Sequence, residues 1–200
     1  GSPGAGAAVD PVAERKADHL ALDASPASQS GVDPGWDDVR LVARALPELS
    51  LADVDPSVDL FGHRLSAPLV LVPMTGGHPD AAPLNRALGA AAERLGLAVG
   101  VGSQRAALRR PDLAETFAAI RDEAPSALVM ANIGAGQLVA QGDAPPLGPD
   151  DVAAVVAMVR ADVLTVHLNV AQELVQPEGD LVTGPLLPAL RDERGIDFVT

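Results

Sequence analysis

Residues 163–180 read VLTVHLNVAQELVQPEGD, an apolar run followed at once by imidazole, carboxamide and carboxylate side chains. A strand that ends in such groups is typical of a binding site, because functional residues gather where a rigid scaffold meets its loops. Successive side chains of a strand point to opposite faces, so we expect His167 and Asn169 to share one face. The carboxylates of Glu173, Glu178 and Asp180 offer oxygen ligands that suit a hard divalent cation.

The same pattern occurs three times upstream, where apolar runs alternate with stretches of helical periodicity. The four runs are residues 69–74, 97–101, 127–131 and 163–168. Helices are predicted over residues 81–95, near 112–123, and from Pro149 onward, where proline suits the first helical turn. The first helix is expected to bury a stripe of Leu84, Leu88, Ala91 and Leu95, and Gly96 to cap it.

Continuously apolar strands separated by helices indicate an α/β fold with a parallel sheet covered on both faces. A doubly wound sheet gathers its function at one switch point, whereas a (β/α)8 TIM barrel gathers it at every strand exit. Here each strand ends in polar or glycine-rich sequence, and no Gly-x-Gly-x-x-Gly opens a helix, so the barrel is favoured. The strand exits are residues 75–78, 102–105, 132–136 and 167–169.

The length of the chain limits how much of a barrel it can form. A full barrel takes about 250 residues, and the 200 residues here supply four β/α units and the start of a fifth. We therefore expect a barrel truncated to about its first four units in residues 58–200. Residues 1–57 are expected to form an N-terminal tail with a loop and helical segment.

Composition excludes several classes of protein. A net charge of −13 and an aromatic content of 2% argue against a nucleic-acid partner, which needs clustered positive charge and stacking platforms. No apolar run approaches the roughly 18 residues of a membrane span. The absence of cysteine excludes disulfides and thiolate metal sites, and it fits a reducing cytoplasm. The sequence predicts a cytoplasmic protein with neither nucleic-acid nor membrane partners.

Five motifs occur in the order of a known family. They are Arg15-Lys16-x-x-His19, Met74-Thr75-Gly76-Gly77, Gly102-Ser103-Gln104-Arg105, Ala131-Asn132-Ile133-Gly134-Ala135, and the long segment from His167 to Asp180. With them the chain resembles the type 2 isopentenyl-diphosphate isomerases, flavoenzymes that interconvert isopentenyl and dimethylallyl diphosphate. Any one of these motifs is weak, but five in order, ending in a long specific one, are strong.

The resemblance implies FMN, Mg2+ and NADPH as reductant, a small diphosphate substrate, and a homo-oligomer. It implies diphosphate contacts from Arg15 and Lys16. It implies flavin contacts from Met74, Thr75, Gly76, Ser103 and Asn132. Groups of the substrate site are implied to be Arg105, His167, Asn169 and Gln172, with Gln172 beside the reacting carbon skeleton as the catalytic residue. Glu173 is implied to bind the Mg2+.

Two departures from the family leave alternatives open. Pro73 stands where the family has a small residue, and it removes a backbone donor there. The resemblance also covers only about half to three-fifths of a family member. The alternatives are therefore an inactive truncated fragment, or another FMN-dependent TIM-barrel oxidoreductase such as a 2-hydroxy-acid oxidase. The Arg15-Lys16 and Gln172-Glu173 pairs argue against the second of these.

Overall fold

The computed structural model describes residues 18, 21–22, 25–26, 31–176, 179–181 and 184. By its internal contacts the chain divides into two compact units, Gly1–Ser57 and Val58–Thr200. In residues 31–57 of the first unit, regular structure is limited to two short 3-10 turns, η2 (Trp36–Asp38) and η3 (Leu51–Asp53). No helix within the described residues combines the length and apolar character needed to cross a bilayer.

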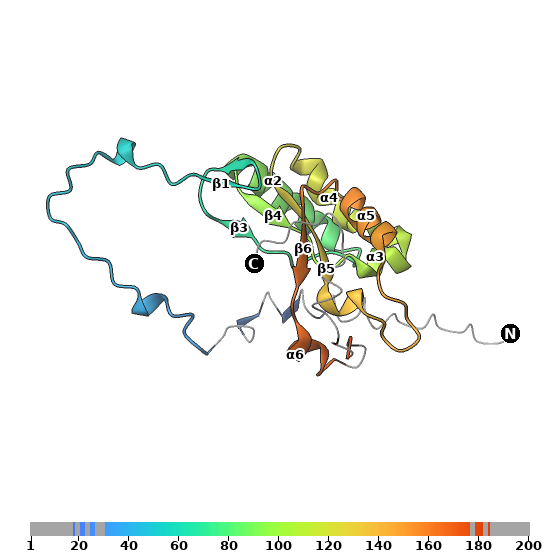
Figure 1. Ribbon diagram of the computed structural model, residues 1–200. Helices are drawn as coiled ribbons and strands as arrows, with labels where there is room; N and C mark the ends of the chain where they lie inside the picture. Colours follow the sequence, from blue (N-terminus) through green and yellow to red (C-terminus); the bar gives the residue numbers. More distant parts are fainter. Residues whose placement is uncertain are drawn as a thin grey trace. The chain divides into compact units, whose positions relative to one another are not determined.

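The second unit is built on a parallel four-stranded sheet (Figure 1). Its strands, in spatial and chain order, are β3 (Val70–Leu71), β4 (Ala98–Gly100), β5 (Val129–Gly134) and β6 (Val163–His167). The crossovers contain α2 (Ala81–Leu95), α3 (Arg105–Arg109), η4 (Pro111–Leu113), α4 (Ala114–Glu123), η5 (Ala135–Leu138) and α5 (Pro149–Met158). A two-stranded hairpin, β1 (Val58–Leu60) with β2 (His63–Leu65), precedes the sheet, and a short helix, α6 (Val170–Glu173), follows β6.

This arrangement confirms a parallel α/β fold and the four predicted strands. The strand order follows the chain without reversal, so the described strands contain no switch point of the doubly wound kind. That order is the one a (β/α)8 barrel requires, and closure into a barrel stays a prediction.

The two faces of the sheet are covered differently. The alternation of side chains along each strand turns Val99, Val129 and Ile133 toward the helices, where they pack with Phe117 and Val155 in the main core. Figure 1 shows α2, α4 and α5 together on that side of the strands. On the opposite face a smaller apolar cluster joins the hairpin to the sheet through Leu65, Ala98, Leu128 and Met130.

Local signals explain the ends of the helices. Gly96 closes α2 in the left-handed conformation, with φ 62°, and its N–H donates to the carbonyl of Ala92. Pro149 occupies the first turn of α5, and the N–H of Gly148 donates to Asp151 at 2.9 Å. Both ends lie where the sequence predicted them.

The buried face of α2 differs from the prediction. Leu84 and Leu95 are exposed, and the buried side is formed by small and polar residues: Ala81, Asn85, Gly89 and Ala92. The reason is the close packing of α2 against α4, because a Cβ on Gly89 would collide with the carbonyl oxygen of Ile120. A leucine stripe is too large for that contact.

The β1–β2 hairpin is closed by a tight turn. The turn lies at Phe61 and Gly62, which both have positive φ as a tight two-residue turn requires. His63, directly after this turn, is the first residue of β2 and is partly buried. Its Nε2 lies 3.8 Å from the Oδ1 of Asp162, at the amino end of β6.

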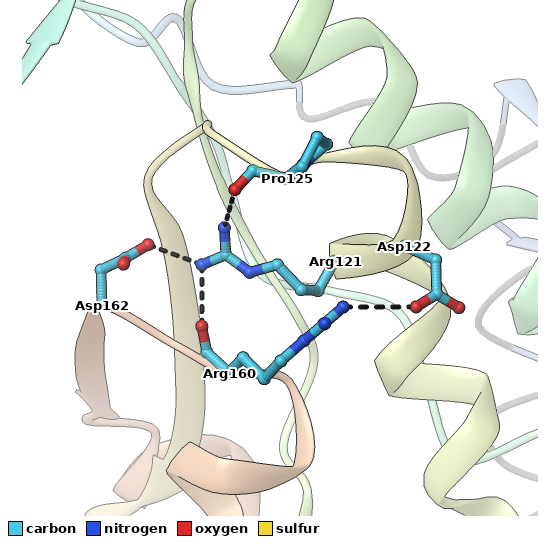
Figure 2. A pocket seen from close by; sticks show the side chains of 5 residues that line it. All are labelled: Arg121, Asp122, Pro125, Arg160 and Asp162. Atoms are coloured by element: carbon cyan, nitrogen blue, oxygen red, sulfur yellow. Dashed lines mark hydrogen bonds and ion pairs between the residues drawn. The ribbon is translucent and has the colours of Figure 1, made fainter.

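A polar pocket lies at the amino ends of the strands, and Arg121 is one of the residues that line it (Figure 2). The Arg121 side chain is buried and donates to Asp162 Oδ2 at 2.6 Å. It also donates to backbone carbonyls near the ends of α4 and α5, those of Ala124, Pro125, Ala127, Val159 and Arg160. One guanidinium thereby satisfies acceptors that the two helix ends leave open.

Arg121→Met is expected to lower the free energy of unfolding by about 3 kcal/mol, because it leaves Asp162 and several carbonyls without a donor. Arg160→Met is the matched control from the same pocket. Its guanidinium is 66% exposed and lies 3.4 Å from Asp122, so less than about 1 kcal/mol should be lost. Urea denaturation of both variants measures the difference, and equal losses would contradict a structural role for the buried network.

Candidate functional site

Polar side chains gather where β4, β5 and β6 end. In the parallel register Asn132 is level with Thr165, and Gly134 is level with His167. Asn132 and His167 are therefore diagonal neighbours on the sheet face opposite the helices. The Nδ1 of His167 lies 2.7 Å from the Oδ1 of Asn132. An amide oxygen can only accept, so this contact is a hydrogen bond in the tautomer that carries its proton on Nδ1.

Gln104 fixes the position of Asn132. Its side chain is fully buried, and its Oε1 accepts from the backbone N–H of Asn132 at 3.0 Å. The backbone N–H of Gln104 donates to the carbonyl of Asn132, also at 3.0 Å. Its Nε2 donates to the carbonyl of Val155 in α5 at 2.9 Å. One amide thus joins the end of β4 to β5 and to the helix behind them.

The loop after β3 is tied to the scaffold rather than left free. The hydroxyl of Thr75 bonds to Asn85 of α2, and the Thr75 carbonyl accepts from the N–H of Gly102 at 2.7 Å. The N–H of Gly77 donates to the hydroxyl of Thr116 in α4 at 2.9 Å. These bonds bring the loop beside the end of β4 and turn the Thr75 side chain away from the strand ends.

Gly76 has a packing reason for being glycine. Its φ is 134°, and a Cβ there would overlap the ring of Phe117. The family resemblance implies a flavin contact at this position, which the absence of a side chain would permit. The structure supplies a different cause, because the aromatic ring that Gly76 accommodates belongs to the protein's own core.

A chain of charged and polar groups extends beyond β6. The Nη1 of Arg105 donates to both carboxylate oxygens of Asp180, each at 2.6 Å. The backbone N–H of Asp180 donates to Glu173 Oε2 at 2.8 Å, and Asn169 Nδ2 donates to Glu173 Oε1 at 2.6 Å. Arg105 and Asp180 are mostly buried, with side-chain exposures of 15% and 10%. The segment after α6 therefore returns to the end of β4.

This pairing changes the predicted cation site. Glu173 and Asp180 were expected to act with Glu178 as neighbouring carboxylates, but both oxygens of Asp180 are engaged by Arg105. Glu178 lies outside the described residues. Among the described residues no cluster of three or more potential metal ligands occurs. Glu173 is left as the carboxylate of this cluster that is not paired with a cation.

The environment of His167 keeps its ring neutral. Burial lowers the pKa of His167 below its usual value of 6.5. The carboxylates of Glu173 and Asp180 act in the opposite direction, and the positive charge of Arg105 acts with burial. These influences show that His167 lies within electrostatic reach of the Arg105–Asp180–Glu173 group.

Apart from Thr75 and Gly76, whose loop is described above, the predicted residues divide into three sets. The structure brings together Ser103, Asn132, Arg105, His167, Asn169 and Glu173 at the ends of β4, β5 and β6. Met74 and Gln172 are exposed, the first in the loop after β3 and the second on α6. Arg15 and Lys16 lie outside the described residues.

Four further residues shape the site and were not predicted: Asn85, Gln104, Thr116 and Gln137. Asn85 could have been found, because it lies at helical spacing between Ala81 and Gly89 on the side of α2 that packs against α4. Gln137 follows directly on the glycine-rich end of β5, and its Nε2 lies 3.2 Å from the hydroxyl of Ser103. Gln104 lies within a polar strand exit, but its bonds to Asn132 and Val155 join residues distant in sequence and leave no local signal. The same holds for the bond between Thr116 and Gly77.

Stability should depend on pH through His167. The unfolded chain binds a proton near pH 6.5, whereas the folded ring resists it, so stability present above pH 6.5 is lost as the pH falls through that value. Unfolding free energies at about pH 7.5 and about pH 5.5 should show this loss, and His167→Gln should reduce it. A proton NMR titration should place the His167 pKa below 6.5. Identical pH slopes in the two proteins would contradict the assignment.

The chain is similar to archaeal proteins named isopentenyl-diphosphate delta-isomerase. It is 47% identical over 173 residues to the protein of Methanosarcina mazei, which covers 86% of this chain and 46% of that relative. It is 47% identical over 178 residues to the protein of Methanoregula boonei, covering 89% and 48%. For Archaeoglobus fulgidus the identity is 43% over 168 residues, covering 84% and 47%. The chain spans about half the length of the curated relatives it matches. No protein-family model matches the chain.

Proposed function

We propose that this chain contributes the substrate and cofactor groups of an isomerase that interconverts isopentenyl and dimethylallyl diphosphate, with reduced FMN and Mg2+, on a (β/α)8 barrel. The observation that carries the proposal is the convergence of Ser103, Asn132, Arg105, His167 and Glu173 at one edge of the parallel sheet. The identity of 43–47% to the relatives, spread over most of the chain, supports it.

The diphosphate end of the substrate is assigned to Arg105, His167 and Asn169, together with Arg15 and Lys16. Guanidinium groups suit phosphate because they present paired donors in a plane. In the structure the Arg105 guanidinium is held by Asp180, which orients it near the strand ends. A diphosphate near His167 would favour the protonated ring, against the effect of burial on its pKa.

The flavin is assigned to Ser103 and Asn132, with the Met74-Thr75-Gly76 loop beside them. The donor and acceptor set fits a flat polar ring, since hydroxyl and amide groups lie at the ends of neighbouring strands. Thr75 can contribute a donor through its backbone N–H, because its hydroxyl proton and its carbonyl are already bonded within the scaffold. When bound, reduced flavin supplies proton exchange at its ring nitrogens.

The protein's own part in the reaction is orientation and electrostatics. Moving a double bond requires one proton to be added to the carbon skeleton and another to be removed. Gln172 is assigned beside that skeleton, where its uncharged amide can donate and accept hydrogen bonds. Next to it, Asn169 and the N–H of Asp180 hold the Glu173 carboxylate in one orientation.

The remaining features of the proposal are the reductant, the location and the assembly. NADPH is proposed to supply electrons to the flavin, and the protein is proposed to act in the cytoplasm. A homo-oligomer is proposed as well. Unpaired outer edges of β3 and β6, among the described strands, are consistent with further pairing because an exposed strand edge is a template for it.

Conversion of isopentenyl diphosphate by the purified protein, under anaerobic conditions with FMN, a reductant and Mg2+, tests the proposal. Glu173→Gln and Gln172→Ala should each reduce turnover by about 100-fold or more, the size of effect expected for a well-placed catalytic group. Glu115→Gln is the control, because Glu115 is exposed on α4 and pairs only with Arg86 among the described residues. Full activity in both site variants would refute the assignment. Oxidation of a 2-hydroxy acid instead would support the oxidoreductase alternative, and a folded protein without either activity would support the inactive fragment.

Magnesium binding should depend on the diphosphate. Mg2+ takes one or two carboxylates and completes its octahedron with water and phosphate oxygens. The described residues offer Glu173 while Asp180 is held by Arg105, so among these residues the diphosphate would have to supply further oxygen ligands. Calorimetric titration with Mg2+ should show at most millimolar affinity alone and about 10-fold or greater tightening with diphosphate, the tightening being lost in Glu173→Gln. Strong binding of Mg2+ alone would contradict this arrangement.

A further inference from the structure

One buried amide at the site has an unused hydrogen-bonding atom. Gln137 lies in η5, directly after β5, and only 8% of its surface is exposed. Its Nε2 is 3.2 Å from the hydroxyl of Ser103, whereas its Oε1 is buried and has no hydrogen-bond partner among the described residues. Buried polar side-chain atoms are almost always paired. An unpaired one at a strand exit therefore marks the place of an absent partner.

Gly134, the last residue of β5, leaves the space that this amide occupies. A Cβ added to Gly134 would lie 3.0 Å from the Nε2 of Gln137 and 3.1 Å from the Nε2 of His167. The two side chains therefore approach each other across the surface of the glycine. Gln137 is bordered by Ser103 on β4's exit and by His167 on β6's exit, so it belongs to the strand-end cluster and not to the apolar core.

We infer that Gln137 contacts the flavin directly, through the atom of its carboxamide that is not bonded to Ser103. This rests on the function proposed above. The bond to Ser103 sets the amide beside a group that is assigned to the flavin and not to the diphosphate, and the isoprenoid chain offers neither donor nor acceptor. The polar edge of the flavin ring alternates carbonyl oxygens with N–H groups.

Either orientation of the amide satisfies this pairing. The oxygen and nitrogen of a glutamine side chain are assigned from their hydrogen bonds, and the hydroxyl of Ser103 can donate to one or accept from the other. Turning the amide therefore preserves the contact with Ser103 and presents the other atom to the ligand. A ring edge with both donors and acceptors complements both arrangements.

Titration of the flavin-free protein with FMN, followed by quenching of flavin fluorescence, tests the inference. Gln137→Met keeps the length of the side chain and removes its hydrogen bonds, so the Kd for FMN should rise by about 10-fold, the equivalent of one hydrogen bond. The melting temperature of the flavin-free variant should change little, because the oxygen removed has no partner among the described residues and only the 3.2 Å contact of Nε2 with Ser103 is lost. The absorption bands of bound FMN should shift relative to those of the unaltered protein.

The control is Gln141→Met in the same loop. Gln141 donates to the carbonyl of Gly136 at 2.7 Å, away from Ser103 and His167, and this change should leave the Kd for FMN unaltered. Gln137→Asn, which withdraws the amide by one methylene group, is the second variant if Gln137→Met does not fold, and it should weaken FMN binding in the same direction.

Three outcomes would overturn the inference. Unchanged FMN affinity in the Gln137 variants would do so and leave the proposed function intact. Equal weakening in the Gln137 and Gln141 variants would show that the loop, and not the amide, supports binding. Failure of the unaltered protein to bind FMN would reject the inference together with the flavin assignment, and the unaltered protein's own titration separates this case from the other two.

Discussion

The parallel pairing of β5 with β6 is the constraint on which the site depends. Its register sets Gly134 level with His167. Asn132, two residues earlier in β5, then lies within hydrogen-bonding distance of the imidazole. A slip of one residue would turn either side chain to the helix face, because side chains alternate along a strand. Gln104 reinforces the pairing from β4, since its side chain and backbone both bond to Asn132. The geometry of the polar groups is thus a property of the sheet and not of the loops alone.

Much of the fold could be predicted because it is encoded locally. The apolar runs, the proline at the start of α5 and the glycine after α2 are signals that involve neighbours in sequence. The buried face of α2 could not be read in the same way. Gly89 is required by the carbonyl of Ile120 in another helix, so small residues form the buried side while Leu84 and Leu95 are exposed, against the usual apolar pattern.

The site shows the same division. Polar residues at strand ends predicted which groups would gather, since parallel strands end at one edge of a sheet. Their partners were not predictable. Asp180, which the sequence suggested as a cation ligand, is bonded to Arg105, 75 positions away. A carboxylate and a guanidinium at such a separation give no local sign of their pairing, and neither does the contact between Gln137 and Ser103, which joins two different crossovers.

The hairpin at the amino end of the sheet has a consequence for how small molecules and water would enter and leave the protein. Leu65 and its neighbours Ala98, Leu128 and Met130 seal the face of the sheet that carries Asn132 and His167 at its far end. In a closed barrel that seal would make the interior blind-ended. In the proposed isomerase, substrate, product and exchanging water would then share a single entrance. Release of product would have to precede the next arrival, and solvent protons would reach the interior only while that entrance was open.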